Sequence, residues 1–382
     1  MNRKQFFILL ALVVVFGAAG IIVYQHNNQS WHGGGAAIGQ KLLPDFPVND
    51  VAQITIKSGT GEVNLARRDN LWRVRERTDY PANFSQISDL LVKFADLKVV
   101  QNEDVGPSQF TRLELLPPDA TPGAGTSIEF KDQGGKTLGW LLLGKKHMKK
   151  PAANSPHGMA DEGWPDGRYV MTSAKTVAVI SDPLDTVQPR PEQWLNKDFL
   201  SIEKPRLIAT QFPDATNSWI LTRTSETNDW QLADAKPREK LDSSKISSVT
   251  SPFSSASFND VAAAGKANSA SNTVVRVETF DGFSYNAKIG PKQDDNYPVT
   301  FTVAANLPPS RTPTPNEKPE DKAKLDKDFQ TQEKTLTDKL AKEASLTNWV
   351  YQLPAYSIDE MLKTRQQLLE DANTNSTAQA EK

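Results

Sequence analysis

The chain has 382 residues, with 44 basic and 46 acidic side chains and a net charge of −2. This balance argues against a broad nucleic-acid-binding surface, which needs a basic excess, so we expect no nucleic-acid partner. The sequence contains no cysteine, which excludes disulfides, thiolate metal ligands, cysteine nucleophiles, iron–sulfur clusters and an acylated lipoprotein anchor.

Residues 1–25 are predicted to form a cytoplasmic tip and a transmembrane anchor. The stretch from Phe6 to Tyr24 has no charge over 19 residues, close to the roughly 20 needed to cross the hydrocarbon core. Arg3 and Lys4 precede it and no Lys or Arg follows until Lys41, so the positive-inside rule places the N-terminus in the cytoplasm. The side chains expected to contact membrane lipid are Phe6, Leu9, Leu10, Val13, Val14, Ile21 and Ile22.

A cleaved signal peptide is the alternative to this anchor. Gly17, Ala18 and Ala19 provide small residues near a plausible cleavage point, but the apolar run continues beyond them to Tyr24. Both interpretations export the rest of the chain. We therefore expect a single-pass protein of the inner (cytoplasmic) membrane, with its bulk periplasmic or otherwise extracytoplasmic. Residues 26–48, rich in Asn, Gly and His, are predicted to form a flexible stalk.

Residues 49–200 are predicted to form a first α+β unit. Alternating apolar and polar residues indicate half-buried strands. Apolar residues at spacings of three and four between Phe84 and Leu97 indicate a helix that buries one face. The strands are expected at residues 51–57, 63–67, 72–74, 127–130, 138–144, 168–171 and 177–180.

Residues 201–306 are predicted to repeat this order as a second unit. Leu221-x-Arg223 matches Leu65-x-Arg67, Trp230 matches Trp72, and a weaker helix opens over residues 241–246. The expected fold class is α+β: a single N-terminal transmembrane helix, two duplicated antiparallel sheet units each covered by a helix, and C-terminal helices. The strands of the second unit are expected at residues 207–210, 219–223, 229–232, 274–280, 285–289 and 299–303.

Residues 307–370 are predicted to form a Pro-rich linker, a charged helix over 318–343, a returning strand and a last helix over 357–369. Residues 371–382 read as a disordered tail. The charged helix carries a narrow apolar seam close to a heptad stripe. Either it packs on its own domain, or it pairs with a partner protein. The seam consists of Leu325, Phe329, Leu336 and Leu340.

No catalytic signature is present. The sequence lacks a phosphate-binding Gly-rich loop, a nucleophile elbow and a zinc-binding H-E-x-x-H helix. His147 lies among lysines that would repel a metal cation. We therefore assign no catalytic, cofactor-binding or metal-binding residue, and we expect a protein that is not an enzyme and needs no cofactor. Four lysines around His147 are candidates for contact with an anionic partner, the alternative being a solvated loop tip; they are Lys145, Lys146, Lys149 and Lys150.

Three stretches of the chain resemble the DUF4340 family, a bacterial domain of unknown function. They are VAQITIKSGTGEVNLARRDNLWRV, YPANFSQISDLLVKFADLKVV and GRYVMTSAKTVAVISDPLDTVQPRPEQWLNKDF. The resemblance implies one N-terminal membrane span followed by repeated units. It also implies an association with exporter components similar to those of gliding-motility ABC transporters, with an ABC permease as the partner. It supplies no site residues.

The leading hypothesis is a non-enzymatic, membrane-anchored extracytoplasmic accessory or scaffold protein of such an export complex. The first alternative is a cell-envelope glycan-binding protein that uses Trp140, Trp164 and Trp194. The second is an enzyme of unrecognised type, which would need a deep pocket with clustered titratable groups.

Overall fold

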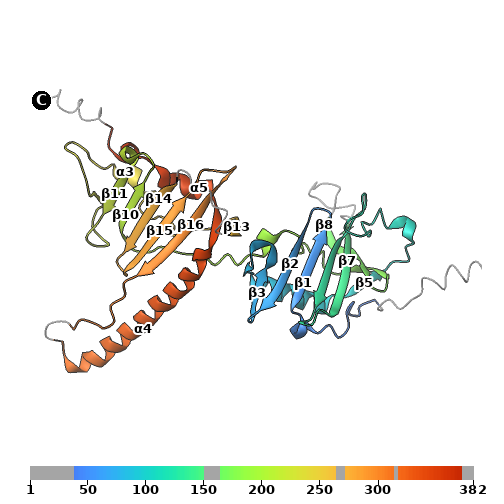
Figure 1. Cartoon of the computed structure of the whole chain (residues 1–382). Coiled ribbons are helices and arrows are strands. Elements are labelled where there is room, and N and C mark those ends of the chain that lie inside the picture. The colour runs from blue at the N-terminus through green and yellow to red at the C-terminus, as the bar shows by residue number, and fades with distance from the viewer. Residues whose placement is uncertain (1–37, 150–163, 264–271, 314–316, 372–382) are drawn as a thin grey trace, which may run out of the picture. The chain divides into compact units, whose positions relative to one another are not determined.

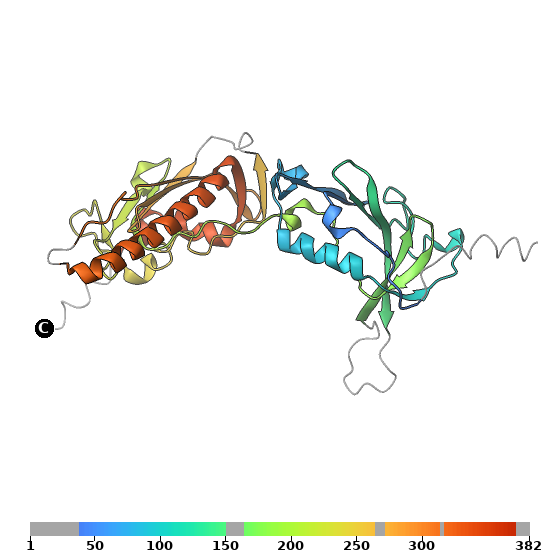
Figure 2. The ribbon, with the colours of Figure 1, turned by 90° about the horizontal axis from the view of Figure 1, so that it is seen from below.

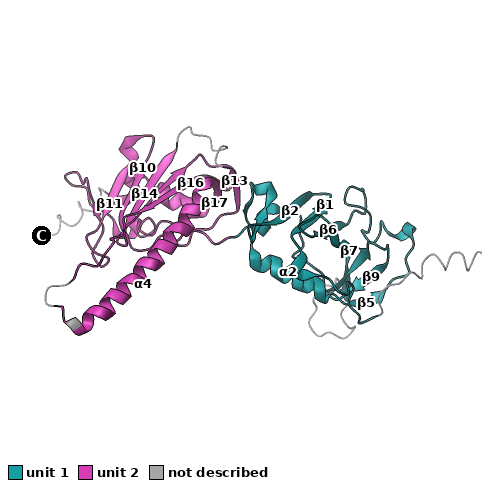
Figure 3. Cartoon of the chain, turned by 60° about the horizontal axis from the view of Figure 1, so that its bottom comes forward, with its two compact units in different colours: residues 1–196 teal, residues 197–382 magenta. Residues whose placement is uncertain are grey.

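The computed structural model describes residues 38–149, 164–263, 272–313 and 317–371 (Figure 1). The chain divides into two compact units, residues 1–196 and 197–382 (Figure 3). Each unit is built on one antiparallel sheet accompanied by helices, so the expected α+β class is confirmed.

The first unit contains a nine-stranded sheet with the order β4-β3-β2-β1-β6-β7-β8-β9-β5. All of the strands predicted for this unit are present. The additional strands β4 and β5 are short and lie at the two edges. The strands are β1 Gln53–Ser58, β2 Gly61–Arg68, β3 Leu71–Val74, β4 Tyr80–Pro81, β5 Val99–Asn102, β6 Thr126–Lys131, β7 Thr137–Lys149, β8 Trp164–Thr172 and β9 Val177–Ile180.

Helix α2, Phe84–Asp96, packs on one face of this sheet (Figure 2). It begins after Asn83, whose side chain accepts a hydrogen bond from the amide of Gln86 at 3.2 Å and so caps the helix. The ring of Phe94 meets Phe130 of β6 edge to face, with 4.7 Å between centroids. Of the predicted apolar stripe, Phe84 at the first position is 68% exposed, whereas the others are buried, namely Ile87, Leu90, Leu91, Phe94 and Leu97.

The second unit contains an eight-stranded sheet with the order β12-β11-β10-β14-β15-β16-β17-β13. The strand β13 was not predicted. The strands are β10 Pro205–Gln211, β11 Trp219–Thr222, β12 Gln231–Leu232, β13 Asp260–Ala263, β14 Thr273–Thr279, β15 Phe283–Ile289, β16 Asn296–Ala305 and β17 Trp349–Pro354.

The two sheets share one strand order once the edge strand β4 is left out. Across the sheets, the order β3-β2-β1-β6-β7-β8-β9-β5 corresponds strand by strand to β12-β11-β10-β14-β15-β16-β17-β13. Leu65 pairs with Ile54 of β1, and Leu221 pairs with Ile208 of β10, the counterpart of β1. The predicted match of the two Leu-x-Arg segments therefore has the correct register.

Main-chain hydrogen bonds outside the sheets recur as well. The amide of Asn83, which caps α2, donates to the carbonyl of Trp194 at 2.8 Å. The amide of Asp242, which caps α3 (Ser243–Ile246), donates to the carbonyl of Leu368 at 3.0 Å. In both units, a segment near the end of the unit thus returns to the start of the helix that follows the first antiparallel strands.

The helix that packs on the second sheet is not the one expected. Residues 241–246 yield only the single turn α3, which buries Ile246. Instead α4, Pro319–Ala344, contacts β16. In chain order α4 lies between β16 and β17, where the first unit joins β8 to β9 by the short turn of residues 173–176. Strand β17 is hydrogen-bonded into the second sheet, so residues 307–370 belong to the second unit.

The apolar seam of α4 faces its own unit. Phe329, Leu336 and Leu340 are half-buried, whereas Leu325 is 38% exposed. Phe329 and Leu336 line a small cavity of about 210 Å³ together with Phe280. These contacts favour the first of the two alternatives for the seam. The expected last helix is replaced by three short turns, α5 Ala355–Ile358, η8 Asp359–Leu362 and η9 Arg365–Leu368.

The predicted membrane anchor, including Phe6 and Ile22, lies outside the described residues. Among the helices that the structure does describe, none combines the length and apolar character needed to span a bilayer.

Candidate functional site

The sheet of the first unit carries a second, smaller apolar cluster on the face opposite α2. Leu142 of β7 pairs with Met171 of β8, and Met171 pairs with Val177 of β9. Strand pleating turns all three side chains away from Phe130 and α2. Residues 103–125, which join β5 to β6, cover this face and contribute Val105, Leu113 and Leu115 to the cluster, with Phe110, Trp140 and Tyr169 packed against it.

Specific main-chain contacts hold the covering segment 103–125 against β7. The amide of Lys145 donates to the carbonyl of Leu113 at 2.8 Å, and within the segment itself Gly125 donates to Leu116 at 2.9 Å. A Cβ atom on Gly144 would lie 2.4 Å from that same Leu113 carbonyl oxygen. Glycine is therefore required at position 144 for the close approach of the two chains.

A pocket of about 710 Å³ opens between this segment and the turn that joins β8 to β9. Its volume lies within the range of small-molecule sites. The wall is mainly apolar and aromatic, formed by Phe110, Leu115, Leu116, Pro117, Trp140 and Met171. The rim is polar, formed by Thr172, Ser173, Lys175 and Thr176.

The electrostatics of this pocket are simple. Lys175 is the one charged side chain among the described residues that line it. Glu129, directly across from Trp140, is held by Lys131 at 2.9 Å and Thr137 at 2.8 Å. Burial opposes ionisation of Glu129, but these hydrogen bonds outweigh it and lower its pKa. The negative charge of Glu129 is thus already balanced by Lys131 within the protein.

Comparison with known families settles the family of the chain. The model of the domain of unknown function DUF4340 matches residues 72–274, more than half of the sequence. The chain belongs to the DUF4340 family. The match runs from β3 to β14 and includes the whole of the pocket. No curated protein and no solved structure matches the chain.

The second unit of this DUF4340 protein lacks the apolar floor of the pocket. Its strand registers place Asn286 where the first unit has Trp140, and Lys288 where it has Leu142. Thr300 takes the place of Met171. The same strand order is therefore built with polar residues at these positions, so the fold itself does not require the apolar ones.

The predicted lysine cluster forms one strand of a ribbon, in which Lys146 pairs with Arg168 and Lys149 with Trp164. Lys146 makes an ion pair with Asp185 at 2.5 Å. Lys145 and Lys149 are exposed, and Lys150 lies outside the described residues. Sequence reasoning thus found a basic strand end, but its described lysines are not among the residues lining the pocket.

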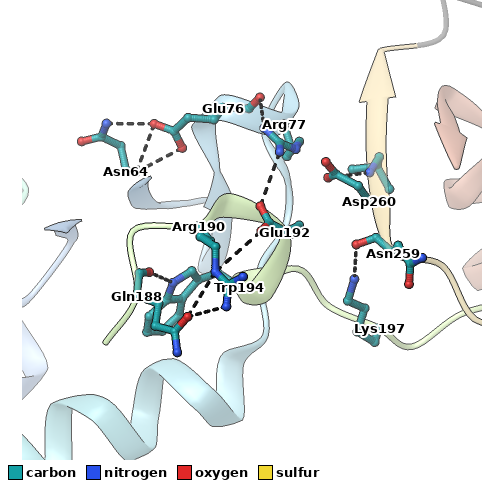
Figure 4. Close-up of polar contacts among 11 residues, drawn as sticks. Asn64, Glu76, Arg77, Gln188, Arg190, Glu192, Trp194, Lys197, Asn259 and Asp260 are labelled. Carbon is teal, nitrogen blue, oxygen red and sulfur yellow. Dashed lines mark hydrogen bonds and ion pairs between the residues drawn. The ribbon is translucent and has the colours of Figure 1, made fainter. Parts of the chain in front are cut away.

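The three tryptophans proposed for glycan binding have different environments. Trp194 is fully buried, and its indole donates to the carbonyl of Gln188 at 2.9 Å (Figure 4). It is therefore a core residue of the DUF4340 domain. Trp164 is 53% exposed at the end of the basic ribbon, and Trp140 is half-buried in the pocket wall.

Two clusters of titratable groups make structural contacts within the second unit. Arg365 is buried and donates to Asp234 at 2.9 Å and to Glu239 at 2.8 Å. Tyr285 donates to the buried carboxylate of Glu343 at 2.8 Å, which fixes α4 to β15. Each cluster ties distant parts of the chain together. Across the described ranges, no group of three or more His, Cys, Asp or Glu side chains is arranged to hold a metal ion.

Proposed function

We propose that this protein is a non-enzymatic accessory module, anchored in the cytoplasmic membrane and exposed on its outer side, that works beside an ABC-type export complex. The uncharged segment from Phe6 to Tyr24, preceded by Arg3 and Lys4, supports the anchor and its orientation. In this proposal the two units are copies of one ancestral module.

The observation that carries the proposal is that the two units share a strand order but differ in what is built on their sheets. The two sheets have one strand order, yet the first unit adds a pocket and the second adds α4. Helix α4 lies outside the common strands, and the pocket is built on β7 and β8 from residues that the second unit does not share. Two units with the same sheet and different surfaces are suited to a scaffold that presents two separate binding surfaces.

Topology and partner are tested in the same strain. A periplasm-dependent reporter enzyme fused after Lys41 should be active, whereas a fusion after Arg3 should be inactive. Purification of the full chain from native membranes after crosslinking should recover an ABC permease and its ATPase. Replacing Leu10 and Val13 by Arg should release the chain from the membrane and abolish that recovery. An inactive fusion after Lys41, or recovery of no membrane protein, would overturn the proposal.

A second function, binding of envelope glycan, is favoured by one observation. Trp164 exposes an aromatic surface at the end of β8, next to exposed Met148 and Lys149. The substitution Trp164→Ala should then abolish co-sedimentation of the full chain with purified cell-wall material, and Trp140→Ala should leave it unchanged. Equal sedimentation of both variants and the wild type would rule out this use of Trp164.

A further inference from the structure

We propose that the pocket of the first unit binds a single-chain amphiphile with an anionic head group, with its chain against Trp140 and its head beside Lys175. This goes beyond the accessory role, because it assigns a ligand to a site that an export scaffold does not require.

The apolar wall sets the chemistry of the ligand body. Phe110, Leu116 and Trp140 face a space that a polar ligand could enter only by losing hydrogen bonds to water without replacement. A flexible aliphatic chain meets no such cost. Each methylene that it buries strengthens binding about fourfold.

The rim sets the chemistry of the head. Lys175 is exposed at the mouth, and the lining residues include no Asp or Glu. Thr172 and Ser173 add hydroxyl groups at the same edge. An anionic head therefore meets a cation and hydrogen-bond donors, whereas a cationic head would meet repulsion from Lys175.

The pocket is formed in advance of binding. Segment 103–125 is held to β7 through Lys145 and Leu113, and the turn opposite is closed by the amide of Lys175, which donates to Thr172 at 2.9 Å. Because both walls are fixed, a ligand pays little ordering cost on entry. The polar residues at the same positions of the second unit indicate that the sheet does not require the apolar floor, which serves the covering segment and the pocket beneath it.

The full chain in nanodiscs of neutral phosphatidylcholine provides the test. A long-chain carboxylate with a diazirine on its chain is added and photoactivated, and labelled peptides are mapped by mass spectrometry. We expect labels in residues 107–118 and 139–143, at several-fold higher yield than with the matching alcohol. Unlabelled carboxylates shortened by two methylenes should compete about 15-fold less well.

Three variants separate pocket binding from partition into the bilayer. The substitution Trp140→Asn, which copies Asn286 of the second unit, should reduce pocket labelling at least tenfold, whereas Trp164→Asn should not. The substitution Ser173→Trp blocks the mouth from an exposed position, so it should abolish labelling without affecting the core. Residue 175 has a φ of 61°, which asparagine tolerates, so the substitution Lys175→Asn removes the charge without straining the turn. It should remove the preference for the carboxylate over the alcohol, and Lys136→Asn should not.

A second arm identifies the source of the amphiphile. Nanodiscs that contain a diazirine-bearing anionic phospholipid should label the pocket only if the ligand is drawn from the membrane. Labelling by the free carboxylate alone assigns a soluble ligand. The proposal is overturned if labels fall outside the pocket residues 107–118, 139–143 and 171–176, or if Ser173→Trp and Trp140→Asn label as the wild type does.

Discussion

The close approach of segment 103–125 to β7 makes a quantitative prediction for Gly144→Ala. The new methyl group would lie 2.4 Å from the carbonyl oxygen of Leu113 and 2.7 Å from a methyl carbon of Leu115. The Leu115 methyl can move by a rotation of its side chain, but the Leu113 oxygen belongs to the main chain, so the covering segment must lift. That movement would break the hydrogen bond from the Lys145 amide to Leu113.

The magnitude follows from two contributions. Overpacking of a closely packed contact costs about 1–3 kcal/mol. Loss of one main-chain hydrogen bond adds about 1 kcal/mol. We therefore expect the first unit to lose about 2–4 kcal/mol, which lowers its melting temperature by roughly 2–4 °C per kcal/mol for a unit of this size.

Hydrogen exchange is the most direct assay. The amide of Lys145 should exchange about 30-fold faster or more in Gly144→Ala if at least about 2 kcal/mol of protection is lost. The control is Gly106→Ala at the start of the same segment, where an added methyl meets nothing within 4 Å and φ is −82°. Equal protection of Lys145 in the two variants would refute the argument that the segment is held by this contact.

The remaining predictions concern charge. Hydrogen bonds from Arg365 and from the main chain lower the pKa of Glu239 to about 2 from 4.5, so the stability it provides is complete above about pH 4.5 and is lost as the pH falls toward 2. The gap in urea midpoint between wild type and Glu239→Gln should close over that range, and a constant gap would contradict the assignment. Burial raises the pKa of Glu343, so its charge opposes folding increasingly as the pH rises above the ordinary carboxyl range. The substitution Glu343→Gln, which keeps an acceptor for Tyr285, should flatten this dependence and leave stability at pH 8 no more than about 1 kcal/mol below wild type, as thermal unfolding will show. Replacing both Lys145 and Lys149 by Glu should weaken co-sedimentation with anionic vesicles by about 1 kcal/mol per lysine removed, whereas Lys136→Glu should not.

Local pattern predicted most of the strands, because alternation between buried and exposed residues is a property of each strand alone. The match of Leu65-x-Arg67 with Leu221-x-Arg223 also gave the correct register. The edge strands β5 and β13 were missed because each fully buries only one of its four side chains, and each is defined by its partner, β9 or β17. Pairing of that kind depends on distant chain segments and leaves little local periodicity.

The pocket was beyond sequence reasoning for the same reason. The Pro-rich stretch around Pro117 and the aromatic Trp140 were both visible in the sequence, but nothing local brings them together. The signal that was available is the internal comparison, since Trp140 and Leu142 stand where the second unit has Asn286 and Lys288. Reading it requires the strand registers, because the sequence match of residues 285–290 with residues 141–144 does not show which side chains share a face with the covering segment.

The connection between β16 and β17, which already carries α4, should tolerate an inserted sequence. The strands on either side pair directly, with Val299 opposite Tyr351, so both ends of the connection are held in one sheet. Closing a longer loop costs only about 0.6 kcal/mol for each doubling of its length. Inserting a fluorescent domain with adjacent termini between the exposed residues Pro309 and Ser310 should therefore leave the sheet able to form and keep the bond from Tyr285 to Glu343. This connection is thus a practical place to tag the protein without blocking either end.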